Sequence, residues 1–90
     1  MSERYRLRIA RPAVKALTEL LPEKVATAAC EFITGPLLDN PHRVGEPLAP
    51  PLAPAWTGRR GTYRVPFLLD EEERIVEVTA IRHRSDAYRT

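Results

Sequence analysis

The 90-residue sequence has one cysteine, Cys30, and two histidines, His42 and His83. A single cysteine excludes an internal disulfide, and the chain has neither a Cys/His cluster nor an HExxH pattern of the kind that holds zinc. A glycine-rich phosphate loop and a serine in a nucleophile elbow are also missing. These absences argue against zinc hydrolases, P-loop nucleotide hydrolases and α/β-hydrolases, and we expect neither a metal nor a cofactor.

Long hydrophobic runs are also missing, since no apolar stretch approaches the ~18 residues of a transmembrane helix. The opening residues MSERYRLRIARP alternate charged and apolar side chains, so they lack the apolar core of a signal peptide. With the lone cysteine, this predicts a cytoplasmic protein with no membrane partner. The length and a hydrophobic content of 43% predict one small globular domain over residues 1–90.

Lysine is scarce as well. The net charge is only +2, but twelve of the 14 basic residues are arginine and only Lys15 and Lys24 are lysine. The guanidinium group is planar and always charged, pairs with phosphate through two hydrogen bonds and stacks on bases. The bias fits a nucleic-acid-binding surface, and it fits a genome rich in G and C equally well.

The hydrophobic pattern predicts an α+β domain. Residues 4–9 alternate strictly, with Tyr5, Leu7 and Ile9 on one face, as in a half-buried strand. Apolar residues at helical spacing then predict a helix over residues 12–20 and a second helix that begins at Pro22 and ends at Gly35. The short junction between them predicts an antiparallel helix hairpin.

The second half of the chain predicts a loop and then strands. Residues 35–54 hold six of the nine prolines and predict a long, partly extended loop. From Trp56 onward the pattern is that of two or three consecutive strands, with a charged turn over Asp70–Arg74 and an interior strand over Ile75–Ile81. Pro66 lacks an amide hydrogen, so we expect either a bulge in its strand or a neighbour that leaves it unpaired. The predicted domain has an N-terminal strand, the helix hairpin and a three-stranded antiparallel meander in one small sheet, with the helices on one face.

Arginines gather in two segments of the predicted sheet, GRRGTYRV at residues 58–65 and IRHR at residues 81–84. Alternation places Arg64 on the face opposite Tyr63, Arg82 on the face of Val78, and His83 on the face opposite Arg82. If the last two strands pair through the charged turn, Arg64 and Arg82 lie near each other. Two such arginines without acidic partners could hold a phosphate and stabilise a phosphorane, or they could simply form a solubilising surface.

Two longer blocks resemble the RelE toxins of actinobacterial type II toxin–antitoxin systems: LPEKVATAACEFITGPLLDNPHRVGEPL at residues 21–48 and WTGRRGTYRVPFLLDEEERIVEVTAIRHRSDAYR at residues 56–89. The resemblance implies a RelE-like, microbial-RNase-like fold and a metal-independent, ribosome-dependent mRNA endonuclease, or mRNA interferase, that inhibits translation. In that chemistry the ribose 2′-OH attacks the scissile phosphate. The implied partners are the ribosome, mRNA and a RelB-like antitoxin that covers the open face in a hetero-oligomer.

The resemblance also assigns roles to residues. It implies that Arg64 holds the scissile phosphate, that Arg82 stabilises the transition state and that Tyr88 orients or stacks on the base. Residues expected to contact RNA or phosphate are Arg59, Arg60, His83 and Arg84.

The chain departs from the family pattern in its lysines. Two lysines of the best-known members are replaced by Ala55 and Thr57, and Glu46 and Ala49 stand where close relatives tend to be basic. The general base is therefore open, with His83 as the one nearby side chain of suitable ordinary pKa. Arg59 and Arg60 preserve positive charge near the phosphate.

Two other functions remain open on this scaffold. ParE toxins share it but poison DNA gyrase by binding. The departures also fit a weakened toxin that mainly binds its antitoxin in a repressor complex.

Overall fold

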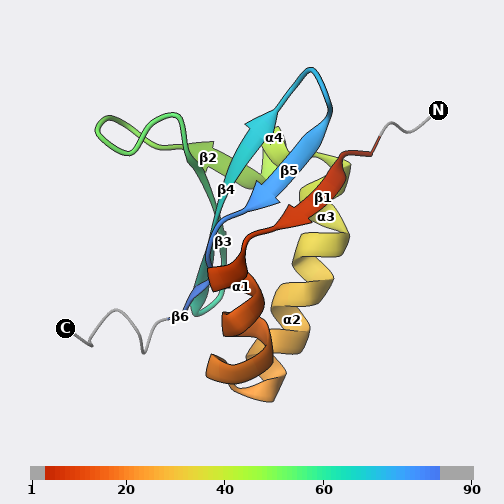
Figure 1. The fold of residues 1–90 in the computed structure, drawn as a ribbon, viewed down its shortest axis with the longest axis vertical. Coiled ribbons are helices and arrows are strands. Elements are labelled where there is room, and N and C mark those ends of the chain that lie inside the picture. The colour runs from red at the N-terminus through yellow and green to blue at the C-terminus, as the bar shows by residue number, and fades with distance from the viewer. Residues whose placement is uncertain (1–3, 84–90) are drawn as a thin grey trace.

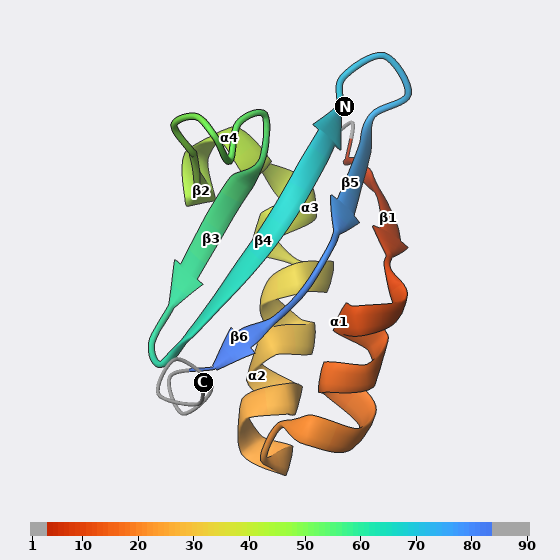
Figure 2. The same ribbon diagram turned by 60° about the vertical axis from the view of Figure 1, so that its left-hand side comes forward.

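In the computed structural model of the chain, which describes residues 4–83, helices cover one face of a six-stranded sheet and leave the other face open (Figures 1 and 2). The order along the sheet is β1-β5-β4-β3-β2, and β6 pairs with β4 beyond the end of β5. The strands are β1 (Arg6–Ile9), β2 (Gly45–Pro47), β3 (Trp56–Arg60), β4 (Tyr63–Asp70), β5 (Ile75–Val78) and β6 (Arg82–His83).

The α+β prediction is confirmed. The expected meander is formed by β3, β4 and β5, which pair in antiparallel fashion in chain order. The N-terminal strand β1 joins the same sheet, where it runs parallel to β5, so that β5 is an interior strand as predicted. The small sheet therefore has antiparallel pairs throughout, apart from the β1–β5 pair.

The helix hairpin is also confirmed. Its first arm runs without interruption through α1 (Arg11–Lys15) and the π-helical segment η1 (Ala16–Leu20), with Pro12 in the first turn, where its missing amide hydrogen costs nothing. The second arm, α2 (Glu23–Thr34), begins after Pro22 and ends at Gly35. Both arms lie on the covered face of the sheet (Figure 2).

The prediction of a continuous loop over residues 35–54 is wrong for its first half. This stretch contains two short helices, α3 (Pro36–Asp39) and α4 (Pro41–Val44), followed by β2. Each helix begins with a proline, a residue that suits the first helical position because its φ is already helical, and the Asn40 side chain caps α4 by accepting from the Arg43 amide. Two of the six prolines here thus begin helices, and only residues 48–54 of the expected loop remain a loop.

The core fills the space between the sheet and α2. Phe67 of β4 is fully buried and approaches β2 so closely that a Cβ on Gly45 would lie 2.6 Å from its ring. Phe32 of α2 makes the same close approach to Gly58 of β3, at 2.9 Å. These two glycines therefore allow the aromatic rings to lie directly against the strands. The other buried residues are Tyr5, Ala13, Ala16, Ala29, Ile33, Leu37, Leu38, Tyr63, Val65, Val76, Val78 and Ile81.

The segment between β5 and β6 contains a bulge, next to the residue that faces Pro66. The Thr79 amide donates to the Pro66 carbonyl at 3.0 Å, but proline has no amide hydrogen with which to complete the pair. Pairing then resumes at Arg82 with Arg64, so Ala80 and Ile81 together face Val65 alone. Of the two expected solutions for Pro66, the bulge thus lies in the neighbouring strand, and β4 itself is continuous.

Candidate nucleic-acid interface

Three arginines form a row across the open face of the sheet. Arg59 of β3 lies directly opposite Arg64 of β4, and Arg64 lies directly opposite Arg82 of β6. Side chains of directly opposed residues point to the same face, with Cβ atoms about 5 Å apart. All three side chains are exposed. We call this set, Arg59, Arg64 and Arg82, the arginine row.

Two local features set its register. The two-residue turn Gly61–Thr62 joins β3 to β4, and Gly61 has a φ of 57°, a backbone conformation that suits glycine. This tight turn places Arg59 opposite Arg64. On the other side, the bulge at Ala80–Ile81 places Arg82 opposite Arg64.

The predicted proximity of Arg64 and Arg82 therefore agrees with the register, but the face predicted for Arg82 is wrong. Alternation placed Arg82 on the face of Val78, yet Val78 is fully buried in the core and Arg82 is exposed on the opposite face. The extra residue of the bulge inverts the alternation after Thr79. His83 remains on the face opposite Arg82, as expected.

The arginine row has no acidic partner within residues 4–83. The ion pairs described there are Arg4–Asp39, Arg6–Glu73 and His42–Glu71, and none of them involves the row. Like charges directly opposite each other in a ladder repel. An anion that accepts hydrogen bonds from several guanidinium groups would remove this repulsion, and a phosphate diester has the charge and oxygen geometry to do so.

Of the remaining candidates, the two that the structure describes, Arg60 and His83, do not join the row. Arg60 lies on the helix side of the sheet, with its guanidinium 5.2 Å from the centre of the Phe32 ring. His83 is directly opposite Tyr63, which is buried on that same side. Arg84 and Tyr88 lie outside the described residues.

A polar cluster at the far end of the sheet was missed in the sequence. The Tyr5 hydroxyl donates to Glu71 at 2.6 Å, and the His42 Nε2 lies 2.6 Å from the other oxygen of the same carboxylate. The pKa of Glu71 is lowered from its ordinary value of 4.5, chiefly by the hydrogen bond from Tyr5 and also by His42. The Arg74 guanidinium lies 4.2 Å from the centre of the Tyr5 ring. No spacing in the sequence indicates this cluster, because it joins Tyr5 just before β1 with residues from α4 and the β4–β5 turn.

Within residues 4–83, no three His, Cys, Asp or Glu side chains come together in a group that could hold a metal ion. The same part of the chain has no helix that is both long and apolar enough to cross a membrane.

Known proteins resemble this chain in sequence. No family model matches it. Toxin RelE of Mycobacterium tuberculosis, however, is 45% identical over 85 residues, which are 94% of this chain and 87% of the relative. The chain belongs to the RelE family of toxins. Toxin RelG of the same organism is 42% identical over 69 residues, which are 77% of this chain and 79% of the relative.

Solved structures of RelE proteins have the same fold. The RelBE2 toxin–antitoxin complex of Mycobacterium tuberculosis contains a chain that is 36% identical, with a TM-score of 0.87 over 91% of this chain and all of that one. The archaeal RelE–RelB complex of Pyrococcus horikoshii matches with a TM-score of 0.62 over 98% of this chain and all of that one. Its identity is 20%, so this second likeness shows the RelE fold alone.

Proposed function

We propose that this RelE-family toxin is a metal-independent endonuclease that cleaves mRNA on the ribosome in the cytoplasm and so inhibits translation. The observation that carries the proposal is the arginine row, in which three exposed guanidinium groups share one face without an acidic partner among residues 4–83. A surface of this kind fits a phosphate of single-stranded RNA better than it fits a neutral ligand.

The chemistry follows from this charge. The ribose 2′-OH loses its proton and attacks the adjacent phosphorus, the bond from phosphorus to the 5′-oxygen breaks, and that oxygen takes up a proton. The products are a 2′,3′-cyclic phosphate and a 5′-OH. Negative charge grows on the phosphate oxygens in the transition state, where Arg64 and Arg82 stabilise it from two neighbouring strands and Arg59 adds a third positive charge.

The structure makes His83 a poor candidate for the general base. Its Cα lies opposite Tyr63, so the imidazole starts from the helix side of the sheet and not from the face of the arginine row. His42 lies at the other end of the sheet beside Glu71. We therefore expect charge stabilisation by arginine to supply most of the catalysis by this chain, with Tyr88 orienting the base of the substrate.

An antitoxin partner forms the second half of the proposal. The mycobacterial RelBE2 structure is a complex of toxin and antitoxin. We propose that a RelB-like antitoxin binds this chain in a hetero-oligomer, covers the open face and supplies acidic side chains to the arginine row. Such pairing would block the phosphate site and remove the repulsion between the arginines together.

The test is a cleavage assay with purified chain, ribosomes and a programmed mRNA, in which the new 5′ ends are mapped. The double variant Arg64→Ala/Arg82→Ala is expected to lose at least about 100-fold in cleavage rate, since removing one charge-stabilising donor commonly costs 10²–10³. Arg8→Ala/Arg43→Ala is the matched control, because both residues are exposed arginines outside the row. Unchanged cleavage by the first variant contradicts the mechanism, and DNA breaks with intact mRNA would favour gyrase poisoning.

One observation favours a second candidate, a weakened toxin that mainly binds its antitoxin and represses their promoter. Thr57 is on the open face, opposite Pro66 and two residues before Arg59, where the family resemblance implies a lysine. A Thr57→Lys variant that raised toxicity in growing cells by an order of magnitude or more would support this candidate. Strong growth arrest by the unmodified chain would contradict it.

A further inference from the structure

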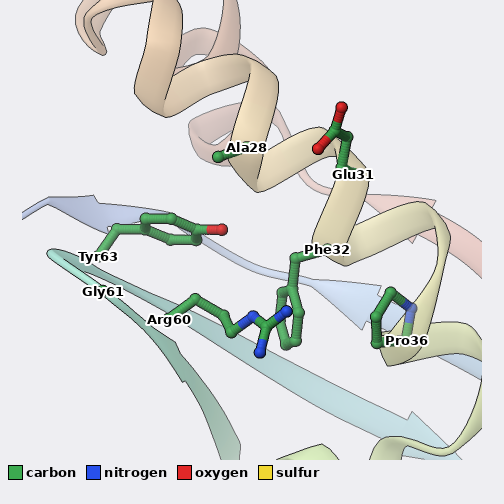
Figure 3. Close-up of a pocket in the computed structure, with 7 residues that line it drawn as sticks. All are labelled: Ala28, Glu31, Phe32, Pro36, Arg60, Gly61 and Tyr63. Atoms are coloured by element: carbon green, nitrogen blue, oxygen red, sulfur yellow. The ribbon is translucent and has the colours of Figure 1, made fainter.

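A groove lies between α2 and the β3–β4 turn, on the side of the sheet opposite the arginine row (Figure 3). Its volume is about 480 Å³, within the 300–1,000 Å³ typical of sites for small ligands. Among its lining residues, the sequence assigned a role only to Arg60, as a contact for RNA or phosphate. The lining residues are Ala28, Glu31, Phe32, Pro36, Arg60, Gly61 and Tyr63.

Tyr63 offers a polar group to the groove. The residue is only 6% exposed, and its hydroxyl makes no hydrogen bond within residues 4–83. Figure 3 shows the Tyr63 ring lying between the sheet and α2. Burial raises the pKa of this phenol above its ordinary 10.0, so it stays protonated and can donate. The hydroxyl belongs to a residue that lines the groove, where a ligand can accept its hydrogen bond.

The groove also separates a positive from a negative side chain. Arg60 stands on the β3 side with its guanidinium against Phe32, and Glu31 stands on the α2 side (Figure 3). Both charges act on the Tyr63 hydroxyl, Arg60 lowering its pKa and Glu31 raising it, yet the two side chains form no ion pair with each other. The lining therefore offers donors and an acceptor to one ligand.

We propose that this groove binds one nucleobase of the RNA substrate and that it prefers guanine. Guanine combines the O6 and N7 acceptors that suit Arg60 with N–H donors on its N1 and N2 that suit the Glu31 carboxylate. Phe32 itself is buried beneath the Arg60 guanidinium, so it supports Arg60 and does not stack on the base. Adenine, cytosine and uracil each lack part of this donor and acceptor pattern.

The backbone connects this groove with the phosphate site of the proposed function, on which the inference rests. Arg59 and Arg60 are consecutive in β3, so their side chains leave opposite faces of the sheet. At Gly61, the next residue, no atom lies within 4 Å of the position that a Cβ would take, so the turn is open. An RNA strand can therefore place a phosphate on the row and pass around this turn to put a neighbouring base in the groove.

The test measures binding of RNA that cannot be cleaved. Pentauridine and its single-guanine, single-adenine and single-cytosine derivatives, all with 2′-O-methyl groups, are titrated into the chain and followed by fluorescence anisotropy. We expect about tenfold tighter binding for guanine than for adenine at one position, the size of discrimination that a good pair of base contacts gives. Glu31→Gln should reduce this preference to less than threefold, and any change in the affinity for pentauridine should match that of Glu23→Gln, which removes the same charge.

Two further variants complete the design. Glu23→Gln makes the same change on the same helix, away from this groove, and should keep the guanine preference. Tyr63→Phe removes only the hydroxyl and should weaken binding of the guanine oligonucleotide by several-fold, while circular dichroism reports whether it folds. A guanine preference that is missing, or that survives in Glu31→Gln, overturns the proposal. The proposal is also overturned if the groove is protected when an antitoxin binds and is unaffected when RNA binds.

The proposed function is tested separately, by the cleavage of mRNA. If mRNA is not cleaved by the chain but the guanine preference depends on Glu31, the groove binds a base and the nuclease proposal is wrong. If mRNA is cleaved and Glu31→Gln leaves both the base preference and the mapped cleavage sites unchanged, the groove proposal alone is wrong.

Discussion

Arg59 lies directly opposite Arg64 in the β3–β4 ladder, and both side chains are exposed on the same face of the sheet. Two guanidinium groups in this relation repel each other, and Arg82 adds a third charge on the other side of Arg64. The open face thus keeps a local destabilisation that a bound anion would relieve.

Removing one of these charges should stabilise the protein. Arg59→Gln is expected to raise the free energy of unfolding by about 0.2–1 kcal/mol in 10 mM salt. The gain should vanish near 1 M salt, where the screening length falls to about 3 Å. Urea unfolding followed by circular dichroism measures both values, with Arg43→Gln as an exposed control outside the row. A gain that is the same at both salt concentrations would show that charge repulsion is not its cause.

The row should also set the salt dependence of RNA binding. Each phosphate contact with single-stranded nucleic acid contributes about −0.7 to the slope of log affinity against log salt. Arg64→Gln and Arg82→Gln should each make the slope less steep by about that amount, measured with the 2′-O-methyl pentauridine from 50 to 300 mM salt. Arg11→Gln, at the start of α1, should leave it unchanged. Equal slopes for all variants would place the phosphate contacts elsewhere.

The close approach of Phe32 to β3 should make Gly58 intolerant of a side chain. A Cβ there would lie 2.9 Å from the Phe32 ring, so Gly58→Ala forces the buried ring to move. We expect a loss of about 1–3 kcal/mol in the free energy of unfolding, the usual cost of overpacking a core. Gly61→Ala is the comparison, because its Cβ meets no atom within 4 Å and its cost comes only from the φ of 57°. A smaller loss at Gly58 than at Gly61 would contradict the packing argument.

The Tyr5–His42–Glu71 cluster should contribute a pH-dependent part of the stability. The pKa of Glu71 is lower in the folded state than its ordinary 4.5. Its contribution is therefore full above pH 4.5 and declines as the pH falls through the folded-state pKa. Glu71→Gln should lower the free energy of unfolding at pH 7, and its difference from the unmodified chain should shrink on acidification toward pH 3. Glu72→Gln, exposed in the same turn, controls for the loss of one negative charge. A difference that stays constant with pH would contradict this assignment.

Local patterns in the sequence predict the elements well. Strict alternation over residues 4–9 and helical spacing after Pro12 and Pro22 reflect the burial of one face, which local sequence determines. The meander follows because the charged turn after Asp70 can only join neighbouring strands. Pro36 and Pro41 suggest a loop but begin helices, because a proline at the first helical position and a proline in an extended loop have the same local φ.

Arg59, Arg64 and Arg82 are all candidates in the sequence, but only part of their arrangement can be predicted from it. The tight Gly61–Thr62 turn was the signal that places Arg59 opposite Arg64, since a two-residue hairpin turn determines the register. The face of Arg82 was not predictable from alternation, because the bulge depends on the pairing of Pro66 with Thr79. The Tyr5–His42–Glu71 cluster could not be predicted either, as its members meet only through the parallel pairing of β1 with β5 and the position of α4.

The bulge at Ala80–Ile81 determines on which face of the sheet Arg82 lies, for the number of residues that this chain has between β5 and Arg82. With the present number of residues, an unbulged ladder would turn the guanidinium of Arg82 into the core and expose the imidazole of His83. A chain shortened by Ala80 could pair without the bulge and would still present Arg82 beside Arg64. Proteins of this fold can therefore differ by one residue in this segment and keep the same chemical group on the open face, provided that the bulge is gained or lost with the residue.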